Sequence, residues 1–258
     1  MRMRKKILSI AAALCIAGCM VCIPDYSEAD AASGYVVENL DRGISAISTG
    51  SGMMVSWRFL ADDSDNSIFK LYRNNALIYT SNAGNATCYL DKDGKSTDTY
   101  KVETVESATV VSSDTCAMQS GSNYLEVKLD VPKAQTSGIT YSPNDCTVGD
   151  VDGDGQYELF VKWDPSNSKD NSQKGKTDKV FIDCYKIDGT KLWRIDLGVN
   201  IRAGAHYTQM LVADYDLDGL AEMVCKTADG TVDGVGNVIG DSSKDYSCLL
   251  YTSPSPRD

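Results

Sequence analysis

The chain has 258 residues, which is enough for one large or two small domains. Its net charge of −11 argues against a nucleic-acid partner, because nucleic-acid binding depends on clustered lysine and arginine. Between residues 33 and 247 there is no C-x-x-C pair, which argues against a thiolate zinc site.

Residues 1–31 are predicted to be a signal peptide. A cationic start, MRMRKK, precedes a long apolar run, and ADAA at Ala29–Ala32 offers a cleavage site after Ala31. We therefore expect a secreted bacterial protein. The alternative is a lipoprotein anchored through Cys19, because IAGC resembles a lipobox. The apolar run is slightly short for a spanning helix, so no stable membrane span is expected.

Residues 33–120 show the pattern of a small β-sandwich. Apolar and polar residues alternate in short runs that Asn, Asp and Gly separate, namely Met53–Leu60, Ser67–Asn74, Ala76–Thr80 and Asp98–Val105. The run is similar to fibronectin type III modules, and its expected role is packing or presentation. Cys88 and Cys116 are candidates for a disulfide.

Residues 121–247 begin with a linker that includes one predicted strand, and they then carry a repeat. The pattern D-x-D-x-D-G-x-x-E occurs at Asp150–Glu158 and again at Asp214–Glu222, each time followed by an apolar strand. Between the copies, two strands flank Asp188-Gly189, which is a strong hairpin signal. A repeated unit of this length is near the size of a propeller blade. The sequence therefore predicts an all-β fold, a sandwich followed by an incomplete β-propeller.

The acidic repeat predicts calcium loops that are not EF-hands. The twelfth position, where an EF-hand has its bidentate Glu, holds Val161 or Cys225, and a strand follows where an EF-hand has a helix. Three alternate Asp side chains around a tight turn can still direct oxygens at one point, and Gly155 and Gly219 permit the turn. The alternative is an acidic Asx-type turn without metal.

Residues 248–258, CLLYTSPSPRD, resemble translated sequencing-adaptor DNA, and we exclude them from reasoning about the fold. The alternative is a natural Pro/Ser-rich tail. On the first interpretation, the native protein is expected to continue beyond this point.

Several long stretches closely resemble family 11 polysaccharide lyases, the bacterial rhamnogalacturonan lyases. They are SPNDCTVGDVDGDGQYELFVKWDPSNSKDNSQ, DGTKLWRIDLGVNIRAGAHYTQ, DLDGLAEMVCKTADGT and the earlier ENLDRGISAI. The resemblance implies an eight-bladed calcium-binding propeller behind a small β-domain, of which this chain holds the first blade or two. It also implies cleavage of the rhamnose–galacturonate backbone of pectic rhamnogalacturonan I by β-elimination. Calcium is then the cofactor, and we expect a monomer.

The resemblance also assigns site residues. Asn144 and Asp164 match substrate contacts. The implied metal ligands are Asp145, Asp150, Asp152, Asp154, Gln156, Glu158, Asp214, Asp216, Asp218, Leu220 and Glu222, with Asp229 held more loosely; Gln156 and Leu220 would bind through backbone carbonyls. We favour a calcium ion that holds Asn144 and Asp164 in place over one that touches the uronate.

β-Elimination needs a neutralised uronate carboxylate, a base for the C5 proton and an acid for the leaving oxygen. The candidates for the base are His206, Lys162, Lys226, Arg202 and Tyr207, and the alternative for His206 is a structural role. The alternative functions are a calcium-stabilised propeller for adhesion or carbohydrate binding without catalysis and, from DGTKLWRIDL, a quinoprotein-like dehydrogenase. The polar insertion WDPSNSKDNSQ favours the lyase over the adhesion protein. The fragment alone is expected to be inactive, because an open propeller leaves sheet edges unpaired.

Overall fold

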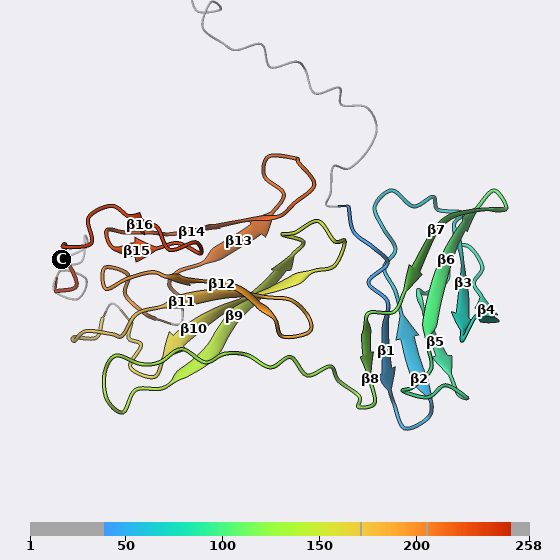
Figure 1. The fold of residues 1–258 in the computed structure, drawn as a ribbon, viewed down its shortest axis with the longest axis horizontal. Coiled ribbons are helices and arrows are strands. Elements are labelled where there is room, and N and C mark those ends of the chain that lie inside the picture. Colours follow the sequence, from blue (N-terminus) through green and yellow to red (C-terminus); the bar gives the residue numbers. More distant parts are fainter. Residues whose placement is uncertain (1–38, 171, 205, 249–258) are drawn as a thin grey trace, which may run out of the picture. The chain divides into compact units, whose positions relative to one another are not determined.

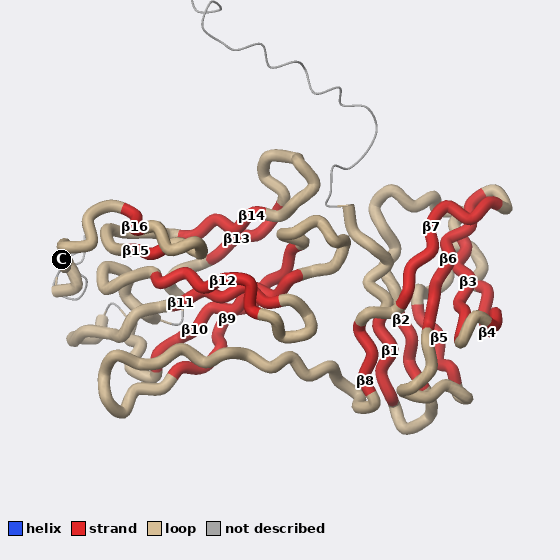
Figure 2. Tube along the Cα trace, in the orientation of Figure 1, coloured by secondary structure: helices blue, strands red, loops and turns tan. Residues whose placement is uncertain are grey.

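The computed structural model describes residues 39–170, 172–204 and 206–248, all of which belong to one compact unit, Val36–Asp258. Figures 1 and 2 show that the regular elements of the described residues are strands, which confirms the all-β prediction. The predicted signal peptide and residues 249–258 of the adaptor-like tail lie outside the described residues. Within the part that is described, no helix is long and apolar enough to cross a membrane.

The first part of the chain forms two four-stranded sheets. One has the order β5-β2-β1-β8, with strands Cys88–Asp91, Met53–Ser56, Ser45–Ser48 and Met118–Ser120. The other has the order β4-β3-β6-β7, with strands Ala76–Thr80, Ile68–Arg73, Tyr100–Glu106 and Thr109–Thr115. Alternate residues of both sheets share one core, in which Val55 of the first sheet packs with Leu71 and Val102 of the second. This packing agrees with a small sandwich.

The suggested disulfide between Cys88 and Cys116 is wrong, because both thiols are free. Cys116 packs against the sandwich core and its thiol donates to the carbonyl of Ile44 at 3.3 Å. Cys88 is exposed at the start of β5, which is the opposite edge of that sheet from β8. The two thiols therefore lie in different environments, one against the core and one at an exposed edge of the sheet.

The second part contains a six-stranded sheet with the order β16-β15-β12-β11-β10-β9. In chain order its strands are β9 (Tyr141–Gly149), β10 (Glu158–Pro165), β11 (Phe181–Tyr185), β12 (Lys191–Asp196), β15 (Thr231–Val232) and β16 (Val238–Ile239). A separate antiparallel pair comprises β13 (Met210–Ala213) and β14 (Glu222–Cys225). Strands β9 to β12 form a consecutive antiparallel meander (Figure 1). In the predicted linker, Ser120–Asp145, no strand lies between the end of β8 at Ser120 and the start of β9 at Tyr141.

The turn between β11 and β12 is the predicted hairpin. Lys186 N–H donates to the carbonyl of Thr190 at 2.8 Å, and Gly189 has a φ of +88°. A φ of this sign is available to glycine without strain, which is why Asp-Gly predicts such turns. The sequence prediction of this hairpin is therefore confirmed.

Strands β10, β11 and β12 are held together by a buried carboxylate. Asp183 on β11 has no exposed surface and accepts hydrogen bonds from Trp163 Nε1 on β10 at 2.8 Å and from Tyr185 OH at 2.6 Å. Arg194 on β12 donates to both of its oxygens at 2.6 Å. The hydrogen bonds to Asp183 raise the pKa of Arg194, and burial raises that of Tyr185 to about 12, so both stay donors at neutral pH.

Candidate functional site

The two acidic loops connect β9 to β10 and β13 to β14. Three N–H groups in each loop donate to carboxylates at equivalent positions, all at 2.9 Å. In the first loop Gly155, Val151 and Gln156 donate to Asp150, Glu158 and Asp154; in the second, Gly219, Tyr215 and Leu220 donate to Asp214, Glu222 and Asp218. The sequence repeat is thus a structural repeat.

Backbone angles extend the equivalence to a position that the sequence pattern does not mark. Gly153 has a φ of +75°, and its counterpart Leu217 has a φ of +64°. A left-handed conformation costs a residue with a Cβ roughly 1–2 kcal/mol. Leu217 accepts this strain because the hydrogen bonds on both sides of it require the turn.

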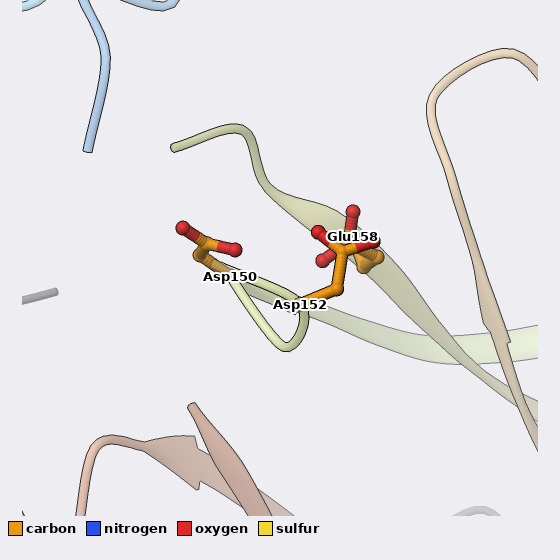
Figure 3. A group of neighbouring side chains, drawn as sticks. All are labelled: Asp150, Asp152 and Glu158. Atoms are coloured by element: carbon orange, nitrogen blue, oxygen red, sulfur yellow. The ribbon is translucent and has the colours of Figure 1, made fainter. Parts of the chain in front are cut away.

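Each loop brings three carboxylates close enough to share one cation. Asp150, Asp152 and Glu158 in the first loop, and Asp214, Asp216 and Asp218 in the second, each offer an oxygen within 4.8 Å of the others. Figure 3 shows the first group around its turn. A carboxylate oxygen that accepts one N–H keeps a lone pair for a metal, so the loop hydrogen bonds leave these groups able to bind an ion.

Electrostatics within the first loop also fit a cation. Burial raises the pKa of Glu158, and the negative charges of Asp152, Asp154 and Asp150 raise it further. A bound cation would relieve this repulsion. The residues therefore suit a divalent ion with oxygen ligands.

Lys186 supplies part of that positive charge from within the protein. Its Nζ lies 2.6 Å from Asp152 Oδ2 and 3.0 Å from Asp154 Oδ2, and these hydrogen bonds raise its pKa. Among the described residues, no salt bridge reaches the second loop. The two loops thus share backbone hydrogen bonds, but in this part of the chain only the first has a lysine paired with its carboxylates.

The loops lie side by side. Ala221 N–H of the second loop donates to the carbonyl of Asp150 in the first at 2.6 Å. Gly149 directly precedes Asp150. A Cβ added to Gly149 would come within 2.5 Å of Val212 Cγ1 and 2.7 Å of Ala221 Cβ. Glycine at position 149 therefore permits the close approach of β9 to the β13–β14 pair.

The remaining predicted ligands are not members of these two three-carboxylate groups. Asp145 on β9 pairs with Lys162, with 2.6 Å between Oδ2 and Nζ. Asp229 accepts the N–H of Asp241 at 2.8 Å. Asp154 and Glu222 sit in their loops as acceptors of backbone N–H groups. For Gln156 and Leu220 the contacts found are those of the N–H group, which donates to a neighbouring Asp.

Asn144 and Asp164, the predicted substrate contacts, come together at a β-bulge. Cys146 pairs with Val161 and Pro143 with Trp163, so two residues of β9, Asn144 and Asp145, oppose the single Lys162 of β10. Bulges re-aim side chains and are common beside active sites. The sequence reasoning missed this bulge, and Pro143, which lacks an N–H for the ladder, was its only local signal.

One carboxylate oxygen of Asp164, Oδ1, has no hydrogen-bond partner. The side chain is buried, and Asn144 Nδ2 lies 3.5 Å from Oδ2. A buried polar atom without a partner costs about 1–3 kcal/mol. Asn144 beside it is exposed. The pair therefore combines an exposed donor, Asn144, with a carboxylate oxygen of Asp164 that lacks both a partner and accessible surface.

Four of the five candidates for the base gather where residues 200–209 meet the insertion after β10. Lys162 is buried and its Nζ also donates to the carbonyl of Tyr207 at 3.1 Å, whereas Arg202 is buried against backbone carbonyls of the insertion. Tyr207 OH lies 3.2 Å from Asp170 Oδ2, and His206 is exposed. Hydrogen bonds from Ser172 lower the pKa of Asp170, with smaller contributions from Tyr207 and His206.

Lys226, the fifth candidate, follows β14 and is exposed. Lys162 and Arg202 are buried, whereas His206 is exposed and Tyr207 is half-buried with its hydroxyl bonded to the exposed Asp170. His206 and Tyr207 therefore lie nearer to a ligand at the surface.

Two family models match consecutive regions of the chain. Residues 35–118 match the beta-sheet domain of rhamnogalacturonan I lyases, and residues 124–249 match the C-terminal domain of rhamnogalacturonan lyase family 11. The chain belongs to rhamnogalacturonan lyase family 11. The resemblance in the sequence is thereby confirmed.

Two lyases of Bacillus subtilis (strain 168) are similar to the chain. The chain is 51% identical to rhamnogalacturonan endolyase YesW and 48% identical to rhamnogalacturonan exolyase YesX, each over 214 residues and 81% of the chain. These regions are 34% and 35% of the two relatives, so the chain spans about a third of their length.

Solved structures of the same two lyases share the fold. The structure of YesX has a TM-score of 0.78 at 45% identity, with 86% of this chain and 38% of that one covered. The structure of YesW has a TM-score of 0.77 at 49% identity, with 85% and 38% covered. Because this level of identity extends over most of the chain, function is best inferred from the family 11 lyases.

Proposed function

We propose that this family 11 chain forms part of a rhamnogalacturonan lyase that cleaves the rhamnose–galacturonate backbone of rhamnogalacturonan I by β-elimination. Family membership suggests the reaction class. The observation in this chain that carries the proposal is the buried, unpartnered Oδ1 of Asp164 beside the exposed Asn144. A sugar hydroxyl can accept from Asn144 and, once the cover over Asp164 moves, donate to its Oδ1. These contacts orient a polysaccharide without demanding a positive protein surface.

The elimination then requires proton transfers at C5 and at the leaving oxygen. Of the candidates in this chain, His206 and Tyr207 are the ones that we propose for contact with substrate. We propose a positioning role for Lys162. It binds Asp145 and the carbonyl of Tyr207, and so connects the segment of Asn144 to the segment of His206. A bound cation supplies charge neutralisation to an acidic substrate or bracing to its own loop.

The cation that we propose for both loops is calcium, since the loops provide carboxylate oxygens around a tight turn in the manner that calcium prefers. We propose bracing as its role, with Asn144 and Asp164 on the strands that flank the first loop.

We also propose that β9–β12 form a propeller blade, that the protein is monomeric, and that it acts outside the cell. Extracellular calcium modules work at dissociation constants of about 10⁻⁴–10⁻³ M.

Lys186 is expected to weaken calcium binding at the first loop. In Lys186→Met, Asp152 and Asp154 lose a competing cation, so the affinity of this loop should rise about two- to fivefold, the range of an exposed ion pair. Calorimetric titration in an Asp216→Asn background isolates the first loop. Lys191→Met, which removes an ion pair with Asp130, is the matched control. An unchanged or lower affinity in Lys186→Met would contradict the prediction.

The lyase proposal is tested with a chimera in which residues 36–247 replace the matching third of the Bacillus subtilis endolyase. On rhamnogalacturonan I, the chimera should produce a rise in ultraviolet absorbance from the unsaturated uronate. Asp164→Ala should lower kcat/KM by about 10- to 100-fold, because a hydrogen bond to a charged group contributes about 1.5–3 kcal/mol.

Asp65→Ala, an exposed position in the first part of the chain, serves as the control and should retain full activity. Bond cleavage without the absorbance rise would refute β-elimination. An Asp164→Ala chimera with normal kcat/KM would refute the assignment of the substrate contact.

A further inference from the structure

Arg202 makes an unusual set of contacts with a single loop. It lies between β12 and β13 and is 7% exposed. Its guanidinium is directed at the insertion between β10 and β11, whose described residues, 166–170 and 172–179, we call the insertion loop. Four backbone carbonyls accept from it: Gln173 at 2.7 Å, Gly175 at 2.8 Å, Asp170 at 3.1 Å and Lys169 at 3.3 Å.

These hydrogen bonds take the place of secondary structure. The described residues of the insertion loop contain no strand or helix, so their carbonyls lack the ladder partners that a sheet provides. A guanidinium has five N–H donors in one rigid plane and can serve several carbonyls at once, whereas an ammonium is a point charge with three donors. The contact therefore requires arginine and not merely a positive charge.

The same two segments are joined at further points. Lys169 N–H donates to the carbonyl of Ala203 at 2.9 Å, and Ala203 N–H donates to Thr177 Oγ1 at 3.0 Å. At the base of the loop, Asn167 and Asp178 exchange hydrogen bonds of 3.2 and 3.0 Å. Arg202 is thus the centre of a network that fixes the insertion loop from its base to its tip.

The position of the loop connects this network to the substrate contacts. The loop begins directly after β10, two residues beyond Asp164, and Ser166 N–H ties its start to the carbonyl of Thr140 at 2.8 Å, just before β9. At its other side, Asp170 meets the hydroxyl of Tyr207, whose carbonyl is bound by Lys162 at the bulge. The insertion loop therefore adjoins both the Asn144–Asp164 pair and the His206 segment.

We propose that Arg202 is a positioning residue that holds the insertion loop as a fixed wall of the substrate site and so determines how the polysaccharide is bound. The inference rests on the proposed lyase function. Arg202 acts through the loop and takes no part in proton transfer. Its loss should therefore affect KM more than kcat.

The first test uses the chain itself. Arg202→Met should speed tryptic cleavage after Lys176 at least tenfold, Arg202→Lys should give an intermediate rate, and methylguanidinium should slow cleavage of Arg202→Ala back toward the parent rate. Lys174→Met, an exposed charge on the same loop, is the control and should leave the rate unchanged. Equal cleavage rates in parent and Arg202→Met, or no rescue by methylguanidinium, would overturn the loop-holding role.

The second test uses the endolyase chimera. Arg202→Met should raise KM about tenfold with kcat within about twofold, since misplacing a binding element loses ground-state and transition-state contacts alike. A fall in kcat at constant KM would overturn the proposal and place Arg202 in the chemistry. A lower melting temperature with unchanged KM would reduce its role to stability. An inactive parent chimera would instead refute the proposed function, and the proteolysis would still decide the loop-holding role.

Discussion

Replacement of Asp183 by alanine is expected to lower the free energy of unfolding by about 3–5 kcal/mol, the range for breaking a buried ion pair by removing one partner. The carboxylate is fully buried and is the common acceptor for Trp163, Tyr185 and Arg194. Its removal leaves the partly buried guanidinium of Arg194 without its main counter-charge and leaves two neutral donors without an acceptor. Each donor comes from β10, β11 or β12, so the loss loosens the centre of the meander.

Urea denaturation followed by tryptophan fluorescence measures the effect, because Trp163 is part of the network. Asp183→Asn keeps acceptor oxygen and shape but loses the charge, and we expect it to lie between the parent and Asp183→Ala. Asp130→Ala is the matched control: this carboxylate pairs with Lys191 and Arg194 at the rim of the same cluster and is 62% exposed. It should cost no more than about 1 kcal/mol. Equal losses for Asp130→Ala and Asp183→Ala would contradict the importance of burial.

Removal of calcium is the second large effect that we expect. A ligand at 100 times its dissociation constant stabilises the folded state by about 2.7 kcal/mol per site, so two loaded loops together contribute about 5 kcal/mol. For a chain of this size that corresponds to roughly 10–20 °C in melting temperature. Thermal melts with excess calcium and with a chelator measure the difference, and elemental analysis counts the bound ion.

The matched variants are Asp152→Asn and Asp216→Asn. Both residues belong to the carboxylate groups, and neither accepts a loop N–H among the described contacts, so the turns should survive the substitution. Each single variant should lose about half of the calcium response, and the double variant should melt at the same temperature with and without calcium. An unchanged parent melt together with no bound calcium would reject the calcium proposal.

Local features of the fold were predictable because short stretches encode them. Alternating apolar residues predicted β2, β3, β4 and β6, with Ala76–Thr80 matched to the residue, and Asp188-Gly189 predicted the β11–β12 hairpin. The repeated acidic pattern predicted two equivalent loops, because three alternate Asp and a following Gly determine a turn whose hydrogen bonds lie within nine residues. The family resemblance followed from the same continuous stretches.

Features that depend on partners distant in the sequence were decided only by the tertiary structure. The bulge of β9 assigned Asp145 to Lys162 and left Asp164 with an open acceptor, and packing against the insertion loop made Arg202 an organiser of carbonyls. Burial on a central strand turned Asp183 into the acceptor for three neighbours. In each case the residue type was visible beforehand, but its role depended on strand register and burial. The Lys162–Asp145 and Arg202–Lys169 contacts, for example, join residues that lie 17 and 33 positions apart.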